Sequence, residues 1–219
     1  EHPQYAPKPD KQPCLKIDLK GVVCMQGTPD NHCIIFFGNG DLVRYSADFK
    51  ELKQVHIETN PRQYIDEHGA RLPEGWIMDT NGYFLAYKEP TPDQPHQRSL
   101  WSPELKKLST LCSHQRVIEF AVLTNQDILV LHGAAYSAAV FRGADEIAIF
   151  GSVSAFAASP FGGFVAGKRD GSITIFNSDY NETSTISGPI PDTLYSAILA
   201  PEDGRVIAAD SAGRISVWT

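Results

Sequence analysis

The sequence predicts an all-β domain built from a repeated unit of short strands. The segment FVAGKRDGSITIFN (164–177) contains an apolar run, a turn and a second run rich in β-branched and aromatic residues, which is typical of a β-hairpin. A similar pattern returns at 206–218, where Trp218 follows Phe176 by 42 residues. No segment is predicted to form a helix, apart from one short turn at 102–108 that would begin at Pro103.

A strand-based unit that recurs at about 40 residues is typical of a β-propeller blade. The two copies also share an upstream turn, with Ser-Pro at 159–160 and Ala-Pro at 200–201. These segments resemble the WD-repeat family, whose blades read roughly as Ser-Pro-Asp-Gly, an apolar strand, Asp-Gly, and a strand that ends in Trp-Asp. The resemblance covers residues 153–219 well and residues 22–150 in outline. Together with the repeat, it implies a β-propeller of about five four-stranded blades.

The N-terminal part of the chain is predicted to complete this fold. Residues 1–13 are rich in proline and are predicted to form an extended arm. Residues 14–20 alternate apolar and polar side chains, as a half-exposed strand does. The last unit ends after its third strand, so we expect the N-terminal strand to fill the outer place and close the ring. The alternative is a ring completed by another polypeptide, because seven blades are common in the WD-repeat family and five are not.

Residues 14–219 are predicted to form a single domain whose blades span about 22–56, 57–102, 112–150, 153–187 and 194–219, the last with the strand at 14–20. Each third strand is predicted to end in an aromatic residue: Tyr45, Tyr87, Phe141, Phe176 and Trp218. A glycine lies five residues before four of these aromatics, and Tyr136 takes its place in the third blade. In this register Asp79 and Asp210 are equivalent, since each follows the second strand of its blade.

Composition and motifs exclude several functions. The net charge of −7 argues against a nucleic-acid partner, which favours a basic face. No apolar run is long enough to predict a membrane span. The cysteines, which we interpret as free thiols in strands, do not match a zinc pattern: Cys14, Cys24, Cys33 and Cys112. No two histidines lie within four residues of each other, and the common catalytic motifs do not occur, so we predict no metal, no cofactor and no catalytic residue.

The candidate partner-binding residues lie at turns and strand ends: Asn39, Asp79, His132, Lys168, Arg169 and Asp210. Each also has a structural interpretation. An aspartate at a turn commonly accepts hydrogen bonds from the backbone, and charged turn residues are commonly solvated. The turns differ between blades, which favours one composite surface over repeated equivalent pockets.

The resemblance implies a non-catalytic scaffold for protein partners, a subunit of a larger assembly, and it favours an intracellular location. The alternative is a secreted carbohydrate-binding propeller. The missing initiator methionine, the even number of cysteines and the glycosylation sequon at Asn181 favour it. A third hypothesis is a glycosidase in which Asp79 and Asp210 flank a sugar. The sequence does not identify the protein partner.

Overall fold

The computed structural model describes residues 20–57, 63–65, 71–73, 76–79, 81–88, 97–112, 117–133, 136–188 and 194–219. Every regular element in these residues is a β-strand, and the strands form five larger antiparallel sheets, as predicted for an all-β chain of repeated units. The described residues contain no helix that could cross a membrane. The predicted arm at 1–13 and residues 14–19 of the predicted N-terminal strand lie outside the described residues.

Each sheet is a meander, because strands that follow one another in sequence pair side by side. The first sheet contains β1 (Val22–Gly27), β2 (Cys33–Phe37), β3 (Asp41–Tyr45) and β4 (Glu51–His56). The second contains β7 (Trp76–Met78), β8 (Phe84–Lys88), β9 (Gln97–Trp101) and β10 (Lys107–Cys112). The third contains β11 (Val117–Val122), β12 (Ile128–His132), β13 (Ser137–Arg142) and β14 (Asp145–Phe150). The fourth contains β15 (Val153–Ala158), β16 (Phe164–Lys168), β17 (Ile173–Phe176) and β18 (Glu182–Ile186).

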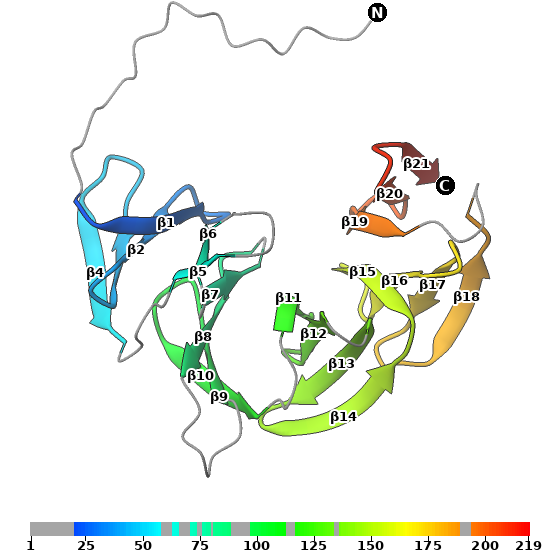
Figure 1. Ribbon diagram of the computed structural model, residues 1–219, viewed down its shortest axis with the longest axis horizontal. Coiled ribbons are helices and arrows are strands. Elements are labelled where there is room, and N and C mark those ends of the chain that lie inside the picture. Colours follow the sequence, from blue (N-terminus) through cyan, green and yellow to red (C-terminus); the bar gives the residue numbers. More distant parts are fainter. Residues whose placement is uncertain are drawn as a thin grey trace, which may run out of the picture.

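The fifth sheet has three strands among the described residues, β19 (Tyr195–Leu199), β20 (Val206–Asp210) and β21 (Ile215–Trp218). A separate two-stranded hairpin consists of β5 (Gln63–Ile65) and β6 (Arg71–Pro73). Figure 1 shows the five sheets following one another along an arc, with the first and fifth sheets at its two ends. The strands β11, β15 and β19 lie toward the inside of this arc, and β14 and β18 lie toward the outside.

The hydrophobic core lies between successive sheets. At the junction of the third and fourth sheets, the ring of Phe164 stacks on that of Phe176 with their centroids 4.5 Å apart, and Phe150 meets both rings edge-on. The second strands are continuous apolar runs, and all five residues of β12 are buried. The outer strands β14 and β18 are largely exposed: β18 is mostly polar, and β14 exposes Ile147 and Ile149. A strand in the middle of a sheet that is covered on both faces needs such a continuous run, so burial explains the sequence pattern.

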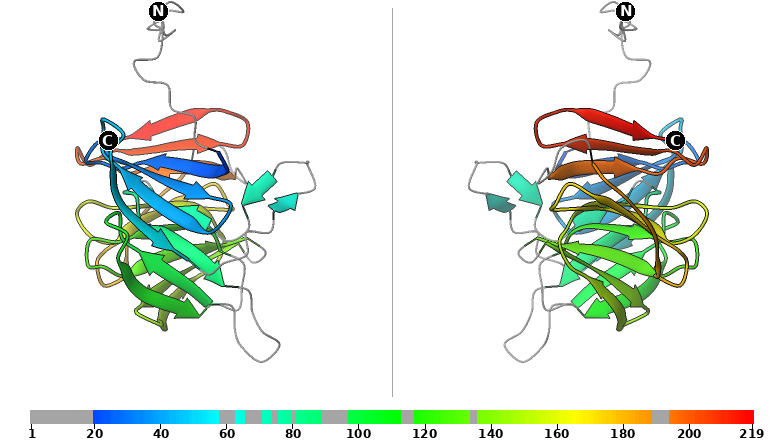
Figure 2. Two further views of the ribbon diagram at one scale, coloured as in Figure 1. Left: turned by 90° about the vertical axis from the view of Figure 1, so that its left-hand side faces the viewer. Right: turned by 90° about the vertical axis from the view of Figure 1, so that its right-hand side faces the viewer.

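The meander divides the turns between two faces of the domain. Face 1 carries the turns after the first strands (28–32, 79–83, 123–127, 159–163 and 200–205) and after the third strands, including 46–50, 102–106 and 177–181. Face 2 carries the turns between second and third strands, including 38–40, 169–172 and 211–214, together with Gly133 and Tyr136 and the connection between the third and fourth sheets at 151–152. Figure 2 shows both faces edge-on, with the β5–β6 hairpin projecting from the side of face 2.

The second sheet corrects the predicted register. The strands around the turn 80–82 are β7 and β8, the first and second strands of their sheet, and not the second and third. The third strand is β9, which ends in Trp101 in place of the predicted Tyr87. Residues 102–106 form a tight turn in place of the helical turn, and β10 extends the sheet to Cys112, beyond the expected limit at residue 102. The turn chemistry misled the prediction because Asn-Gly favours a tight turn at either face.

Candidate protein-interaction surface

The structure divides the six predicted site residues between the two faces. Asn39, His132, Lys168, Arg169 and Asp210 lie at turns or strand ends of face 2. Asp79 follows the first strand of its sheet and lies on face 1. The predicted equivalence of Asp79 and Asp210 is therefore wrong, because a shift by one strand reverses the chain direction and moves the residue to the opposite face.

On face 2, Arg169 stacks over an exposed tyrosine from the neighbouring sheet. The guanidinium carbon of Arg169 lies 4.4 Å from the ring centroid of Tyr136, a distance at which a cation–π attraction forms. Tyr136 is 40% exposed, so the outer side of the pair is open to a partner. No carboxylate among the described residues forms an ion pair with Arg169. We call Tyr136, Lys168 and Arg169 the Tyr136 cluster.

Backbone hydrogen bonds fix the Tyr136 cluster at the junction of the third and fourth sheets. The amide of Arg169 donates to the Ser152 carbonyl at 2.8 Å, and the amide of Val153 donates to the Tyr136 carbonyl at 2.8 Å. The ammonium of Lys168 donates to the Gly151 carbonyl at 3.2 Å. Both cationic side chains therefore project from a backbone that is held on each side of the junction.

Sequence reasoning did not select Tyr136, although a signal was present. Tyr136 occupies the place where four blades were predicted to have glycine, and its φ is 45°. A bulky residue with positive φ is uncommon and costs of the order of 1 kcal/mol relative to glycine. Backbone strain of this kind is concentrated at functional sites.

His132 does not belong to the exposed part of face 2. It is 4% exposed, and its Nδ1 lies 3.4 Å from the hydroxyl of Ser137. Burial lowers the pKa of His132, and the nearby positive charge of Arg98 lowers it further. The histidine is therefore a neutral, buried residue at the end of β12.

Asn39 and Asp210 shape the turns that carry them. The Asp210 carboxylate accepts from the amides of Ala212 and Arg214 at 2.9 Å each, and from Nε of Arg214 at 2.6 Å. These hydrogen bonds, led by the Arg214 amide, lower the pKa of Asp210. Asn39 accepts from the amide of Asp41 at 3.0 Å and donates to its carboxylate at 2.7 Å. Both side chains therefore have the structural role that aspartate and asparagine commonly have in turns.

On face 1, Asp79 is a buried carboxylate that joins two sheets. One oxygen accepts from the amides of Asn81 and Tyr83 at 2.9 Å each, and the other accepts from the amide of Val122 in β11 at 3.3 Å. The side chain is 6% exposed. Burial raises the pKa of Asp79 to about 6, even though the backbone hydrogen bonds lower it.

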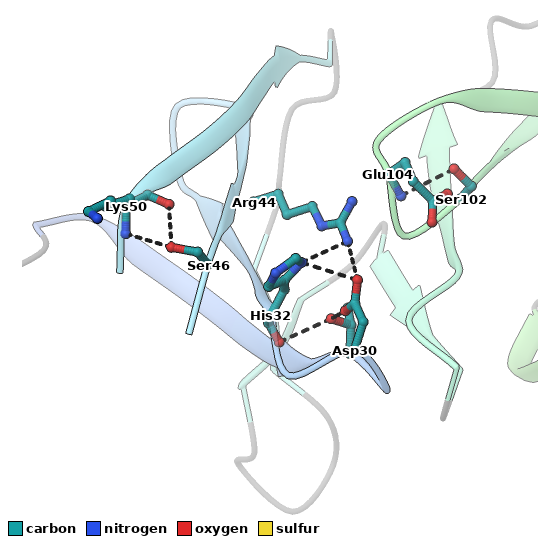
Figure 3. Close-up of polar contacts among 8 residues, drawn as sticks. Asp30, His32, Arg44, Ser46, Lys50, Ser102 and Glu104 are labelled. Carbon is teal, nitrogen blue, oxygen red and sulfur yellow. Dashed lines mark hydrogen bonds and ion pairs between the residues drawn. The ribbon is translucent and has the colours of Figure 1, made fainter. Parts of the chain in front are cut away.

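Face 1 also contains carboxylate–arginine networks that the sequence did not reveal. Figure 3 shows Arg44 reaching from β3 to Asp30 and to His32, whose Nδ1 lies 2.8 Å from the guanidinium. In the third sheet, Arg142 donates to both oxygens of Asp127 at 3.0 and 2.7 Å. No sequence motif marks these pairs, because each forms between a first turn and a third strand that are separate in sequence. In each pair, the carboxylate of a turn residue binds an arginine of the third strand, so the ion pair holds the turn against that strand.

The same network connects the third and fourth sheets. The Tyr180 hydroxyl, in the turn before β18, donates to the Asp127 carboxylate and accepts from the Asn125 amide at 2.8 Å. These contacts lower the pKa of Asp127, with the Arg142 hydrogen bonds as the largest cause. Asp127 is therefore a structural carboxylate between two sheets.

Two other predicted features have simple surroundings. Cys33 is a free thiol whose pKa burial raises, in agreement with the predicted free cysteine at this position. Asn181 is exposed in the turn before β18. Its backbone N–H donates to the side-chain Oδ1 of Asn177 at 2.9 Å. The side chains of Cys24 and Cys112, and all of Cys14, lie outside the described part of the structure. Within the described residues, no group of three or more His, Cys, Asp or Glu is arranged to hold a metal ion.

No protein-family model matches the sequence, and no curated protein matches it. Solved structures do match the fold. The C-terminal WD40 domain of Sif2 is 12% identical with a TM-score of 0.55, and the match covers 90% of this chain and 54% of that chain. The Cps50 (Swd1) β-propeller domain of Myceliophteria thermophila is 10% identical with a TM-score of 0.58, covering 89% of this chain and 64% of that chain.

A third similar structure is BBS1N in complex with ARL6DN, at 9% identity and a TM-score of 0.57, covering 90% of this chain and 64% of that chain. The chain thus spans between about half and two thirds of the length of these structures. At these identities the comparison establishes a β-propeller fold of the WD40 type and nothing about function.

Proposed function

We propose that this chain is a non-catalytic scaffold that binds other proteins as a subunit of a larger assembly, and that the Tyr136 cluster on face 2 contacts a partner. The observation that carries the proposal is the exposed Arg169–Tyr136 pair on a fixed backbone. Arginine and tyrosine are enriched among the residues that dominate binding energy at protein interfaces. Because Arg169 has no ion pair with a carboxylate among the described residues, its charge is suited to bind an acidic group of a partner protein.

The carboxylate geometry does not favour the glycosidase hypothesis. A glycosidase places two carboxyl groups on either side of one glycosidic bond, roughly 5 to 10 Å apart. Asp79 and Asp210 lie on opposite faces, and each accepts hydrogen bonds from its own turn. The similar BBS1N structure was solved with a partner, ARL6DN, which is a further reason to consider protein binding for this fold.

The Tyr136 cluster is tested by substitutions that spare the fold. Arg169→Glu reverses an exposed charge, and Tyr136→Gly removes the aromatic ring while relieving the positive φ, so neither is expected to lower stability by more than about 1 kcal/mol. We expect both variants to lose a common set of partners at least tenfold when the tagged chain is purified from its native source and its partners are quantified by mass spectrometry. Such a loss corresponds to about 1.4 kcal/mol, as hot-spot residues provide.

The matched control is Lys106→Glu, which makes the same charge change at an exposed residue of face 1. It should retain these partners. If Arg169→Glu and Tyr136→Gly both retain every protein that co-purifies with the wild-type chain, the Tyr136 cluster is not an interface.

We also propose that residues 14–19 form the fourth strand of the fifth sheet and pair with β21. The predicted strand extended to Lys20, which the structure places in the turn before β1. In the four-stranded sheets, third strands such as β13 and β17 are mostly buried. In β21, by contrast, Ile215 is 72% exposed and Val217 is 52% exposed. The alternating apolar residues of 14–19 fit a strand at this edge.

This closure is tested by disulfide cross-linking in a chain whose native cysteines are replaced by serine. Ile17→Cys is combined with Ile215→Cys in one variant and with Val217→Cys in another. A disulfide requires Cα atoms within about 7 Å, so an intramolecular bond is expected in at least one variant if the strands pair. Cross-linked dimers would instead indicate strand exchange between copies, and free thiols in both variants after oxidation would contradict the pairing.

A further inference from the structure

A cavity of about 730 Å³ opens on face 1, on the side of the domain opposite the Tyr136 cluster. Its walls are the ends of the inner strands β11, β15 and β19 and the turns that follow β7 and these strands. The volume falls within the range of about 300 to 1,000 Å³ that is common for ligand sites.

The lining combines apolar surface with acidic side chains. Its apolar part includes Phe156, Ala157 and Leu199, and Leu199 is 57% exposed. Among the described residues, the acidic side chains of the lining are those of Asp79, Glu119 and Glu202, and the lining includes no lysine, arginine or histidine. The cavity is therefore one-sided in charge, which distinguishes it from an ordinary apolar groove.

Asp79 and Glu119 differ in how far their carboxyl groups are free to bind a ligand. Asp79 is buried and accepts three backbone hydrogen bonds, so little of its capacity to accept further hydrogen bonds from a ligand remains. Glu119 projects from β11 and, within the described residues, makes no hydrogen bond and no ion pair. Glu119 is exposed to solvent, and desolvation on the cavity side raises the pKa of its carboxyl group.

We propose that this cavity binds a segment of a partner protein that inserts a lysine or arginine next to leucine-sized apolar residues. The cationic head would pair with Glu119, and the aliphatic part of the same side chain would pack along the apolar wall. Charge complementarity selects this occupant: the carboxyl groups give the cavity a negative charge, and an acidic segment would be repelled by Glu119. The inference rests on the proposed scaffold function but concerns a different face from the Tyr136 cluster.

The test measures binding of the pure chain to three fluorescein-labelled peptides by fluorescence anisotropy. The peptides are Ala-Leu-Arg-Leu-Ala and two versions in which citrulline or glutamate replaces arginine. Citrulline keeps the shape of arginine and removes its charge. We expect the arginine peptide to bind about threefold to fivefold more tightly than the citrulline peptide, as for a solvent-accessible ion pair, and the glutamate peptide to bind least.

The variants assign this preference to the cavity. Glu119→Gln keeps the size of the side chain and is expected to abolish the preference for arginine over citrulline. Leu199→Ala, at an exposed position of the apolar wall, is expected to weaken all peptides that bind. The control Glu146→Gln removes the same charge from an exposed residue of β14 and should leave binding unchanged. Thermal unfolding of each variant shows that the fold is retained.

Equal binding of the arginine and citrulline peptides to the wild-type chain would overturn the proposal, and so would an unchanged preference in Glu119→Gln. These failures are distinguishable from a failure of the proposed function. If Arg169→Glu loses partners while no peptide prefers the wild-type cavity, the chain remains a scaffold and the face 1 site is wrong. If the peptide preference holds while Arg169→Glu retains all partners, only the assignment of face 2 fails.

Discussion

Replacing Gly163 with alanine is expected to lower the free energy of unfolding by about 4 kcal/mol, the largest effect of the substitutions considered. Gly163 precedes β16 with a φ of +70°, a conformation that costs a residue with a side chain about 1 to 2 kcal/mol. A Cβ atom at this position would lie 2.1 Å from the Phe176 carbonyl oxygen and 2.4 Å from that of Asn177. Backbone atoms of a packed sheet cannot move aside as a flexible side chain can, so the pairing of β16 with β17 would be disturbed.

Gly204→Ala separates the two contributions. Gly204 has a φ of +82°, and a Cβ atom there would meet nothing within 4 Å. This control should therefore lose only about 1 kcal/mol, from backbone conformation alone. Urea unfolding followed by circular dichroism gives both free energies. Equal losses in the two variants would show that the carbonyl contacts at Gly163 contribute nothing.

The second large effect is a pH dependence caused by Asp79. Its folded-state pKa of about 6 lies above the ordinary value of 3.8 because of burial, so the folded protein binds a proton that the unfolded chain has released between about pH 4 and pH 6. Stability therefore falls as the pH rises through this window, by about 1.4 kcal/mol per pH unit and about 3 kcal/mol in total. Well below pH 4 the carboxyl group is protonated in both states, and well above pH 6 it is ionised in both, so the dependence levels off on both sides of this window.

Asp79→Asn removes this titration while keeping the shape of the side chain. We expect the free energy of unfolding of the wild-type chain, minus that of the variant, to decrease by about 3 kcal/mol from about pH 3 to pH 7, with about 2 kcal/mol of this decrease between about pH 4 and pH 6. The carboxyl group of Glu119 lines the same cavity and titrates in both proteins, so its contribution largely cancels in the difference. Asp145→Asn makes the same substitution at an exposed residue of β14 and is the matched control. A constant difference for Asp79→Asn would show that its pKa is not raised.

Much of the fold could be predicted from local patterns. Turn residues such as Gly171 and the apolar runs around them located the strands of the fourth and fifth sheets, because period and turn chemistry act over a few residues. The prediction of the strand register in the second sheet was wrong for a physical reason. Asn81-Gly82 satisfies the requirements of a tight turn regardless of which two strands it joins, so the strands on its two sides were assigned as the second and third strands although they are the first and second.

The sequence by itself determined that the chain forms antiparallel strands with tight turns, and it identified Lys168 and Arg169 as charged residues in a well-formed hairpin. The tertiary structure alone decided which residues share a face. It separated Asp79 from Asp210, placed Tyr136 under Arg169, paired Asp127 with Arg142, and left Glu119 without a counterion among the described residues of a cavity. The reason is that the direction of the chain reverses at every strand, so the face of a turn depends on a count of strands that short-range preferences do not encode.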